Sequence, residues 1–361
     1  MRHYLAVFGV ILGIVIPLTA SASPPKVVAD IAPVHSLLAK LMDGVGIPGL
    51  LIPAGASPHE YSFRPSEAKA LSEAQVVFWI GESLTPWLEK PLESLGSNAT
   101  KIELLDVEGI QTYEFREGAT FEAHDHGDGH NEGHAEGHAD KHHDKHAGHH
   151  DEHDKKDDHH DTHDDHDGKD KHHAKAHHDD HGGHHDHDHH GEDPHAWLDP
   201  VNAKVWVAEM GRVLSEADPA NAEKYASNVN KVSAQLDQLI AATEASLSES
   251  GDLKFIVFHD AYQYFERRFG LSAAGAISLG DATDPSPARI REIQEKVRDL
   301  GITCAFTEPQ FNPGILKAVF GDDQSITLGV MDPLGVDIPE GIDHYDTLIK
   351  EMVNSVQQCN E

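Results

Sequence analysis

The sequence has few of the features that mark several large classes of protein. Its 361 residues include two cysteines, and 28 basic residues stand against 62 acidic ones, which gives a formal net charge of −34. This excess of negative charge argues against binding nucleic acid, whose phosphates would repel the chain, and it is compatible with the capture of cations. The chain also lacks a His-Glu-x-x-His motif, which supplies the general base of one large class of zinc hydrolases.

The chain has a single long apolar run, and this run stands at its N-terminus. Arg2 and His3 precede the run from Tyr4 to Leu18, and the small residues Ala20 to Ala22 follow it. This order predicts a secretory signal peptide, residues 1–22, cleaved after about Ala22. The run is shorter than the roughly 20 residues that cross a bilayer, and no cysteine near the cleavage site offers a lipid anchor. We therefore expect a soluble protein in the periplasm.

The two cysteines form an even pair in a chain that we expect to be exported. Oxidising compartments favour disulfides, so we predict a bond between Cys304 and Cys359 that ties the C-terminal helix to the C-terminal lobe. Two thiolate metal ligands are the competing interpretation. It is weaker because the two residues are isolated and lack the paired spacing of zinc–thiolate sites.

A tract from about Glu117 to Asp193 consists mainly of His, Asp, Gly and Lys, and it contains 25 of the chain's 31 histidines. It has almost no aliphatic residues to offset the entropy of ordering, so we predict that it is disordered. Its imidazoles would bind several ions weakly, for capture, buffering or transfer by proximity. A spacer with no role in metal binding is the alternative. One cluster in the tract comprises His184, His185, His187, His189 and His190.

On both sides of the tract, short apolar runs alternate with helical stretches. This alternation predicts an α/β fold with parallel sheets. About 340 residues remain after the signal peptide, enough for two lobes with separate cores. The expected strands are residues 26–31, 49–52, 75–80, 101–105, 255–258, 273–277, 302–306 and 325–328. The expected helices include residues 34–42, 66–74, 84–95, 260–269 and 287–300.

No glycine or proline interrupts the chain between Pro219 and Gly251. Apolar residues recur there at helical spacing, which predicts one helix of about 30 residues, roughly 45 Å long at 1.5 Å per residue. Such a helix would act as a stiff strut between the lobes, and two helices broken near Ser233 are the alternative. The expected division is an N-terminal lobe that includes the tract (23–216), a linking helix (217–250) and a C-terminal lobe (251–361).

Three histidines outside the tract share one local context, a turn next to a strand or a helix. His59 follows an expected strand, His195 stands where the tract ends, and His259 directly follows another strand. Parallel α/β folds bind ligands at the carboxyl ends of their strands, so we predict that these three meet in the crevice between the lobes. For each histidine taken alone, a helix cap or a surface position is the alternative. Three imidazole nitrogens with a carboxylate or a water complete the tetrahedron of a zinc site. His35 and His344 lie within helical stretches, and we expect them to be structural.

The segments around these histidines resemble the ligand motifs of a known family, the ZnuA-type solute-binding proteins of zinc importers. The three segments are GASPHEYSFRPS from Gly55, DPHAWLDP from Asp193 and FHDAYQYF from Phe258. Their order, the His-rich tract just before the second motif and the long helix are also similar to that family. So are the segments Thr307–Gln310 and Met331–Gly335, and the resemblance covers essentially the whole mature chain.

The resemblance implies two α/β lobes joined by a rigid helix, with Zn²⁺ held in the cleft by His59, His195 and His259. It implies a monomer without catalytic activity that delivers the ion to the permease and ATPase of an ABC importer. A periplasmic zinc chaperone is a further expected partner. Manganese-type relatives place a carboxylate at the position of His259, so three imidazoles favour zinc over manganese, without excluding copper, nickel or cobalt.

The fourth ligand has two main candidates, a water molecule or the carboxylate of Asp332, whose position in this family can approach the metal. Some zinc-specific members carry an acidic residue just before the first histidine, but Pro58 stands there in this chain. Glu60 is a weaker candidate. Asp-Pro pairs also form turns, so a purely structural role for Asp332 stays open.

Two other functions fit part of these observations. A zinc enzyme also combines three histidines with an open water position, but it needs a general base beside that water. A periplasmic zinc buffer without an importer would act through the tract. Deleting the tract distinguishes an importer subunit from such a buffer. The importer subunit would retain one tight site, whereas the buffer would lose nearly all of its capacity.

Overall fold

The computed structural model describes residues 23–116, 121, 191–278, 285–310, 313–321 and 325–359. The predicted signal peptide lies outside these residues, as does nearly all of the tract, including His184, His185, His187, His189 and His190. Cleavage after Ala22 and disorder of the tract therefore stay predictions. Within the described residues, no helix combines the length and apolar character that a bilayer span requires.

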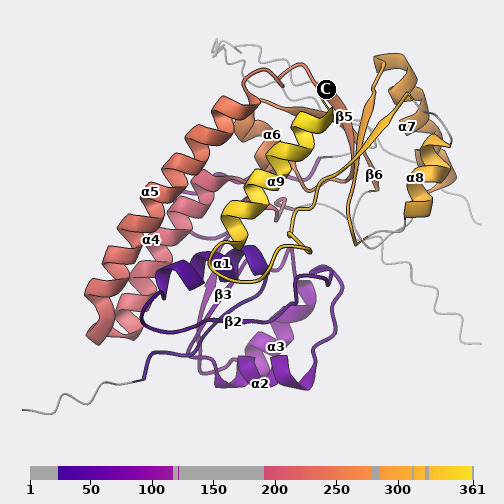
Figure 1. Cartoon of the computed structure of the whole chain (residues 1–361). Coiled ribbons are helices and arrows are strands. Elements are labelled where there is room, and N and C mark those ends of the chain that lie inside the picture. The colour runs from indigo at the N-terminus through magenta and orange to yellow at the C-terminus, as the bar shows by residue number, and fades with distance from the viewer. Residues whose placement is uncertain are drawn as a thin grey trace, which may run out of the picture. The chain divides into compact units, whose positions relative to one another are not determined.

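Two four-stranded parallel sheets form the framework, which confirms the predicted α/β fold (Figure 1). The strand order is β2-β1-β3-β4 in the first sheet and β6-β5-β7-β8 in the second. The first sheet comprises β1 (Val27–Ala29), β2 (Gly49–Leu50), β3 (Val76–Trp79) and β4 (Thr100–Glu103). The second comprises β5 (Lys254–His259), β6 (Ser272–Ser278), β7 (Cys304–Thr307) and β8 (Thr327–Val330). The buried strands β1 and β5 each lie inside their sheet, and the carboxyl ends of parallel strands are where such folds usually bind ligands.

Helices connect the parallel strands, as their crossovers require. The helices are α1 (Ala32–Leu41), α2 (Pro65–Glu73), α3 (Glu89–Ser94), α4 (Pro200–Ala217), α5 (Ala222–Leu247), α6 (Gln263–Phe269), α7 (Pro287–Leu300), α8 (Pro313–Phe320) and α9 (His344–Cys359). One expected helix, residues 84–95, is instead a 3₁₀ turn (Pro86–Leu88) followed by α3. A continuous helix would need an N–H at Pro91 to bond the carbonyl of Trp87, and proline has none.

The long helix α5 has 26 residues and is about 39 Å long at 1.5 Å per residue. It runs unbroken through Ser233, where the alternative interpretation placed a break. It starts later than expected because Pro219–Asn221 form a separate 3₁₀ turn. Helix α5 packs along α4, and the two lie side by side in Figure 1.

The apolar core differs from the two separate cores that we expected. One cluster of buried residues includes Phe78 of the first sheet, Trp206 of α4, Leu236 of α5 and Phe306 of the second sheet. The reason is that α9 follows the second sheet in the chain but contacts α1 and α5 as well as β8. A smaller cluster, which includes Ile256, lies on the other face of the second sheet with α7 and α8.

The structure joins Cys304 on β7 to Cys359 at the end of α9 by a disulfide, with Cα atoms 5.7 Å apart. The sequence separation of 55 residues makes the bond a substantial constraint on the unfolded chain. We expect the double variant Cys304→Ala/Cys359→Ala to lose about 4 kcal/mol of unfolding free energy, from the loop-closure entropy. Thermal unfolding with and without a thiol reductant checks this. The reductant should lower the Tm of the wild-type protein and leave that of the double variant unchanged.

Candidate metal centre

Three histidines from distant parts of the chain meet in the structure. His59 lies in the loop after β2, His195 precedes the 3₁₀ turn Ala196–Leu198, and His259 is the last residue of β5. One possible ligand atom from each histidine lies within 4.8 Å of those of the other two. Among the described residues, these three side chains form a group that could hold a metal ion. The ring centroids are 5.3 Å apart for His195 and His259, 5.7 Å for His59 and His195, and 6.4 Å for His59 and His259.

The space among the three rings matches a single ion. Zinc holds nitrogen ligands at about 2.0–2.1 Å, which places two ligand atoms of a tetrahedron about 3.3 Å apart. Ring movements on the order of 1 Å would therefore close the group on an ion. The cavity here has a volume of about 10 Å³, which is about one water-sized sphere and too small for an organic ligand. It is lined by Ser57, Pro58, His59, His195, Trp197, His259, Glu308, Gln310, Pro333 and Leu334.

Aromatic residues hold the loop that carries His59. The indole Nε1 of Trp87 donates to the carbonyl of Pro58 at 2.7 Å. The Trp87 ring contacts Tyr61 and Phe63, with centroids 5.8 and 5.2 Å away. The loop after β2 is therefore fixed on both sides of the histidine, although it contains no regular secondary structure.

Buried carboxylates orient the other two histidines. The Nδ1 of His195 lies 2.7 Å from Oδ1 of Asp193, and the Nδ1 of His259 lies 2.6 Å from Oε1 of Glu308. All four side chains are buried. When Nδ1–H donates to an ionised carboxylate, the lone pair of the ring resides on Nε2, which becomes the better metal ligand. Each pair thus fixes both the tautomer and the ring orientation of a candidate ligand.

The charges of these carboxylates suit a divalent cation. Burial raises the pKa of Asp193 to about 6, and it also raises the pKa of Glu308, although His259 opposes that shift. Burying two negative charges is costly unless a positive charge compensates them. A dication among the three rings would balance both carboxylates, so the local charge is arranged for an ion such as Zn²⁺.

Two aromatic residues enclose the histidine group. The Trp197 ring lies 5.2 Å from the His195 ring, and its Nε1 donates to the carbonyl of Pro333 at 2.7 Å. The hydroxyl of Tyr262 donates to the carbonyl of Met331 at 2.7 Å. Both aromatic side chains are buried, so they limit the access of water to the rings.

Asp332, the predicted protein candidate for the fourth ligand, lies outside the three-histidine group. Its Oδ1 accepts from the backbone N–H of Leu334 at 2.9 Å, and its Oδ2 accepts from that of Val336 at 2.6 Å. The amide of Gln310 also donates to Oδ1 at 3.2 Å. These bonds are those of a turn-forming aspartate. The weaker candidate, Glu60, is exposed.

The other two histidines of the described chain lie apart from the group, at helix positions. The Nε2 of His35 in α1 lies 3.1 Å from the carbonyl of Pro48, and that of His344 in α9 lies 2.8 Å from the carbonyl of Leu334. Asp199, the second-last residue of the second motif, is the N-cap of α4 and accepts from Val201 N.

Sequence reasoning missed Asp193 and Glu308. Asp193 was assigned to the end of the tract, and its position two residues before His195 was the available signal. Glu308 lies 49 residues from its partner His259, so no spacing reveals the pair. The one available signal is its place after β7. Strand β7 is the neighbour of β5 in the sheet, and His259 lies at the carboxyl end of β5.

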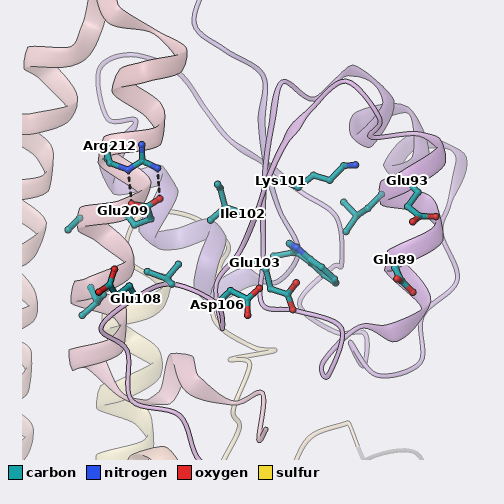
Figure 2. Close-up of a pocket in the computed structure, with 14 residues that line it drawn as sticks. Glu89, Glu93, Lys101, Ile102, Glu103, Asp106, Glu108, Glu209 and Arg212 are labelled. Atoms are coloured by element: carbon teal, nitrogen blue, oxygen red, sulfur yellow. Dashed lines mark hydrogen bonds and ion pairs between the residues drawn. The ribbon is translucent and has the colours of Figure 1, made fainter. Parts of the chain in front are cut away.

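A larger groove of about 960 Å³ lies beside β4, between α3 and α4, and it is distinct from the histidine group (Figure 2). Arg212 there pairs with Glu209. None of the acidic residues that line the groove belongs to a converging metal-binding group among the described residues. Its acidic residues are Glu89, Glu93, Glu103, Asp106, Glu108 and Glu209.

Comparison with known proteins gives a match over nearly the whole described chain. Residues 27–359 match the family model of the periplasmic component A of the zinc-uptake complex, ZnuA. The high-affinity zinc uptake system protein ZnuA of Brucella abortus is 44% identical over 333 residues, which cover 92% of this chain and 91% of that protein. The corresponding protein of Paracoccus denitrificans is 37% identical over 342 residues, or 95% and 94% of the two chains. A crystal structure of ZnuA superposes with a TM-score of 0.65 at 21% identity, covering 94% of this chain and all of that one.

Proposed function

Since the chain belongs to the ZnuA family of periplasmic zinc-uptake components, we propose that it binds one Zn²⁺ ion through His59, His195 and His259 and passes it to an importer. Proteins of this family are binding components of transport rather than enzymes. The convergence of three imidazole ligand atoms within 4.8 Å is the observation that carries the site assignment. In this proposal the importer consists of an ABC permease and its ATPase. The chain reaches the periplasm through a cleaved signal peptide and acts there as a monomer.

In the proposed complex the ion lies in the cleft between the two lobes, and each histidine contributes one nitrogen. Water takes the fourth position, because the backbone N–H groups of Leu334 and Val336 already engage both oxygens of Asp332. Three neutral imidazoles with one water give the tetrahedron that zinc adopts. An oxygen-rich site would suit manganese better. The composition of the site therefore supports zinc as the cargo.

We assign the His-rich tract an auxiliary role. Its imidazoles, His184, His185, His187, His189 and His190 among them, would bind further ions weakly and raise the zinc concentration near the cleft. A periplasmic zinc chaperone is a second candidate partner, from which the tract would receive ions.

Deleting residues 122–190 tests this division of roles. The described ligands and their carboxylate partners lie outside the deleted segment, so the shortened chain should retain one tight zinc site and lose the weak ones. Metal analysis of protein purified without added metal, followed by calorimetric zinc titration, gives the number of tight sites and the number of weak sites. Adding His59→Ala to the shortened chain should remove the remaining tight site. A zinc buffer that works through the tract would instead lose nearly all of its capacity on deletion.

Growth at low zinc separates delivery from binding. Cells that carry the cognate permease but lack this chain should recover growth when they receive the full chain or the shortened chain. They should not recover with His59→Ala. Recovery with all three proteins would contradict a role for the three-histidine site in import.

A further inference from the structure

Arg116 stands where the described chain leads into the tract, and it forms a buried ion cluster. Its Nε donates to both carboxylate oxygens of Asp260 at 3.0 Å, and Nη2 also pairs with that residue. Its Nη1 and Nη2 donate to the two oxygens of Glu266 at 2.8 Å. The exposed fractions of the three side chains are 11%, 8% and 3%. A forked guanidinium that satisfies two buried carboxylates holds both in a defined geometry.

The backbone on either side of the tract fixes Arg116 next to the segment that carries His195. Glu114 and Glu192 form an antiparallel bridge. The N–H of Phe115 donates to the carbonyl of Gly191 at 3.1 Å, and the N–H of Asp193 donates to that of Tyr113 at 2.7 Å. We call these two short segments, residues 113–116 and 191–193, the roots of the tract. The roots run side by side although the tract separates them in the chain.

The ion cluster reaches both carboxylate-oriented histidines. On one side, Asp260 is the residue after His259. On the other side, the amide of Gln263 in α6 donates to the carbonyl of Glu114 at 3.0 Å and to Oδ2 of Asp193 at 3.1 Å. Asp193 is the carboxylate that orients His195. Arg116 therefore holds the N-terminal end of α6 between the turn after β5 and the roots of the tract.

We infer that Arg116 is a positioning residue of the zinc site, which keeps the rings of His195 and His259 aligned before the ion arrives. The inference rests on the proposed function. Without the guanidinium, the carboxylates of Asp260 and Glu266 would be buried together without a compensating cation and would separate or draw in water. The turn that follows His259 would then move relative to Asp193. The site would have to reorganise on binding, which lowers affinity without removing any ligand.

The variant Arg116→Met tests this role. We expect its zinc affinity, measured by competition with a chelator of known affinity, to fall about ten-fold, with one tight ion per chain retained. The visible absorption of bound Co²⁺ should also change, because it depends on the geometry of the ligands around the ion. Arg116→Lys keeps the positive charge but not the fork, so its affinity should lie between those of the wild type and Arg116→Met.

Lys40→Met is the matched control. Lys40 in α1 is 5% exposed and pairs with Asp346 of α9, so its loss also leaves a carboxylate without its cation. It belongs to neither the roots nor α6, and we expect lower stability with unchanged zinc affinity and Co²⁺ spectrum. If Arg116→Met matches the wild type in both readouts, or Lys40→Met weakens zinc binding equally, the inference is wrong.

Gln263→Leu decides the matter if Arg116→Met does not fold. This change introduces no buried charge and breaks the link from α6 to Asp193. Weaker zinc binding with an altered Co²⁺ spectrum would support the inference, and wild-type behaviour would overturn it. These outcomes are separate from failure of the proposed function, in which the wild-type chain itself would lack a tight site that depends on His59.

Discussion

Replacing His59, His195 or His259 with alanine is expected to weaken tight zinc binding by about a hundred- to a thousand-fold. Zinc sites of four ligands have binding free energies of about 10–16 kcal/mol, or roughly 2.5–4 kcal/mol for each ligand. Each 1.4 kcal/mol is a factor of ten in the dissociation constant. In the proposed site the three side chains share one ion, so each single variant should show a similar loss. Calorimetric titration against a competing chelator measures the affinity.

Two variants separate loss of a ligand from general damage. His35→Ala removes a buried histidine of α1 outside the group, and its tight zinc affinity should stay near that of the wild type. Asp332→Ala should behave similarly if water occupies the fourth position, whereas a loss comparable to that of the histidine variants would identify Asp332 as a ligand. Tight binding that persists in the double variant His59→Ala/His259→Ala would reject the site.

Asp193→Asn and Glu308→Gln are each expected to weaken zinc binding about 10- to 100-fold while the chain still binds one ion. Partners that fix the ring of a metal-ligating histidine typically contribute that much to affinity. In each variant an amide replaces the carboxylate that accepts from Nδ1, so the tautomer and the basicity of the imidazole are no longer fixed. Titration of both single variants at one pH gives the affinities.

Stability of the metal-free protein is the second measurement on these variants. Burial raises the pKa of Asp193 to about 6 and that of Glu308 above its usual range, so the charged forms are costly without a cation. A neutral side chain of the same shape avoids that cost, and we expect the unfolding free energy to change by less than about 1 kcal/mol. A large loss of stability together with unchanged zinc affinity would mean that the two carboxylates support the fold rather than the ligands.

Local patterns were sufficient to predict the strands of this fold and the helix α7. Buried parallel strands have short apolar runs between glycine- and proline-rich turns, and each of the eight expected strands has a counterpart in the two sheets. The helix α7 begins after its N-cap Ser286 and ends at Gly301, which adopts the left-handed conformation. These two residues are start and stop signals that can be recognised in the sequence itself. The shared core was not predictable in this way, because it depends on α9 returning to α1 through tertiary contacts.

The residues of the candidate site likewise fall into those with a local sequence signal and those without one. The turn contexts of His59, His195 and His259 are local, so the sequence pointed to all three residues. Their supporting network is not local, since 49 residues separate His259 from Glu308 and 144 separate Arg116 from Asp260. Such partners carry no periodicity, and a buried acidic residue looks the same in sequence as an exposed one. Asp193 was hidden for a different reason, because it stands at the end of a tract that is rich in aspartate.

The paired roots of the tract have a consequence for how such chains diverge. The bridge between Glu114 and Glu192 pairs the segment before the tract with the segment after it, so the chain leaves the fold and re-enters it at the same place. Insertions or deletions within residues 122–190 then leave the backbone beneath His195 in register, because they lie beyond Phe121, which packs against the described core. In the proposed function, the number of histidines there can change with local metal supply, while Arg116, Asp193 and α6 keep the geometry of the three-histidine group.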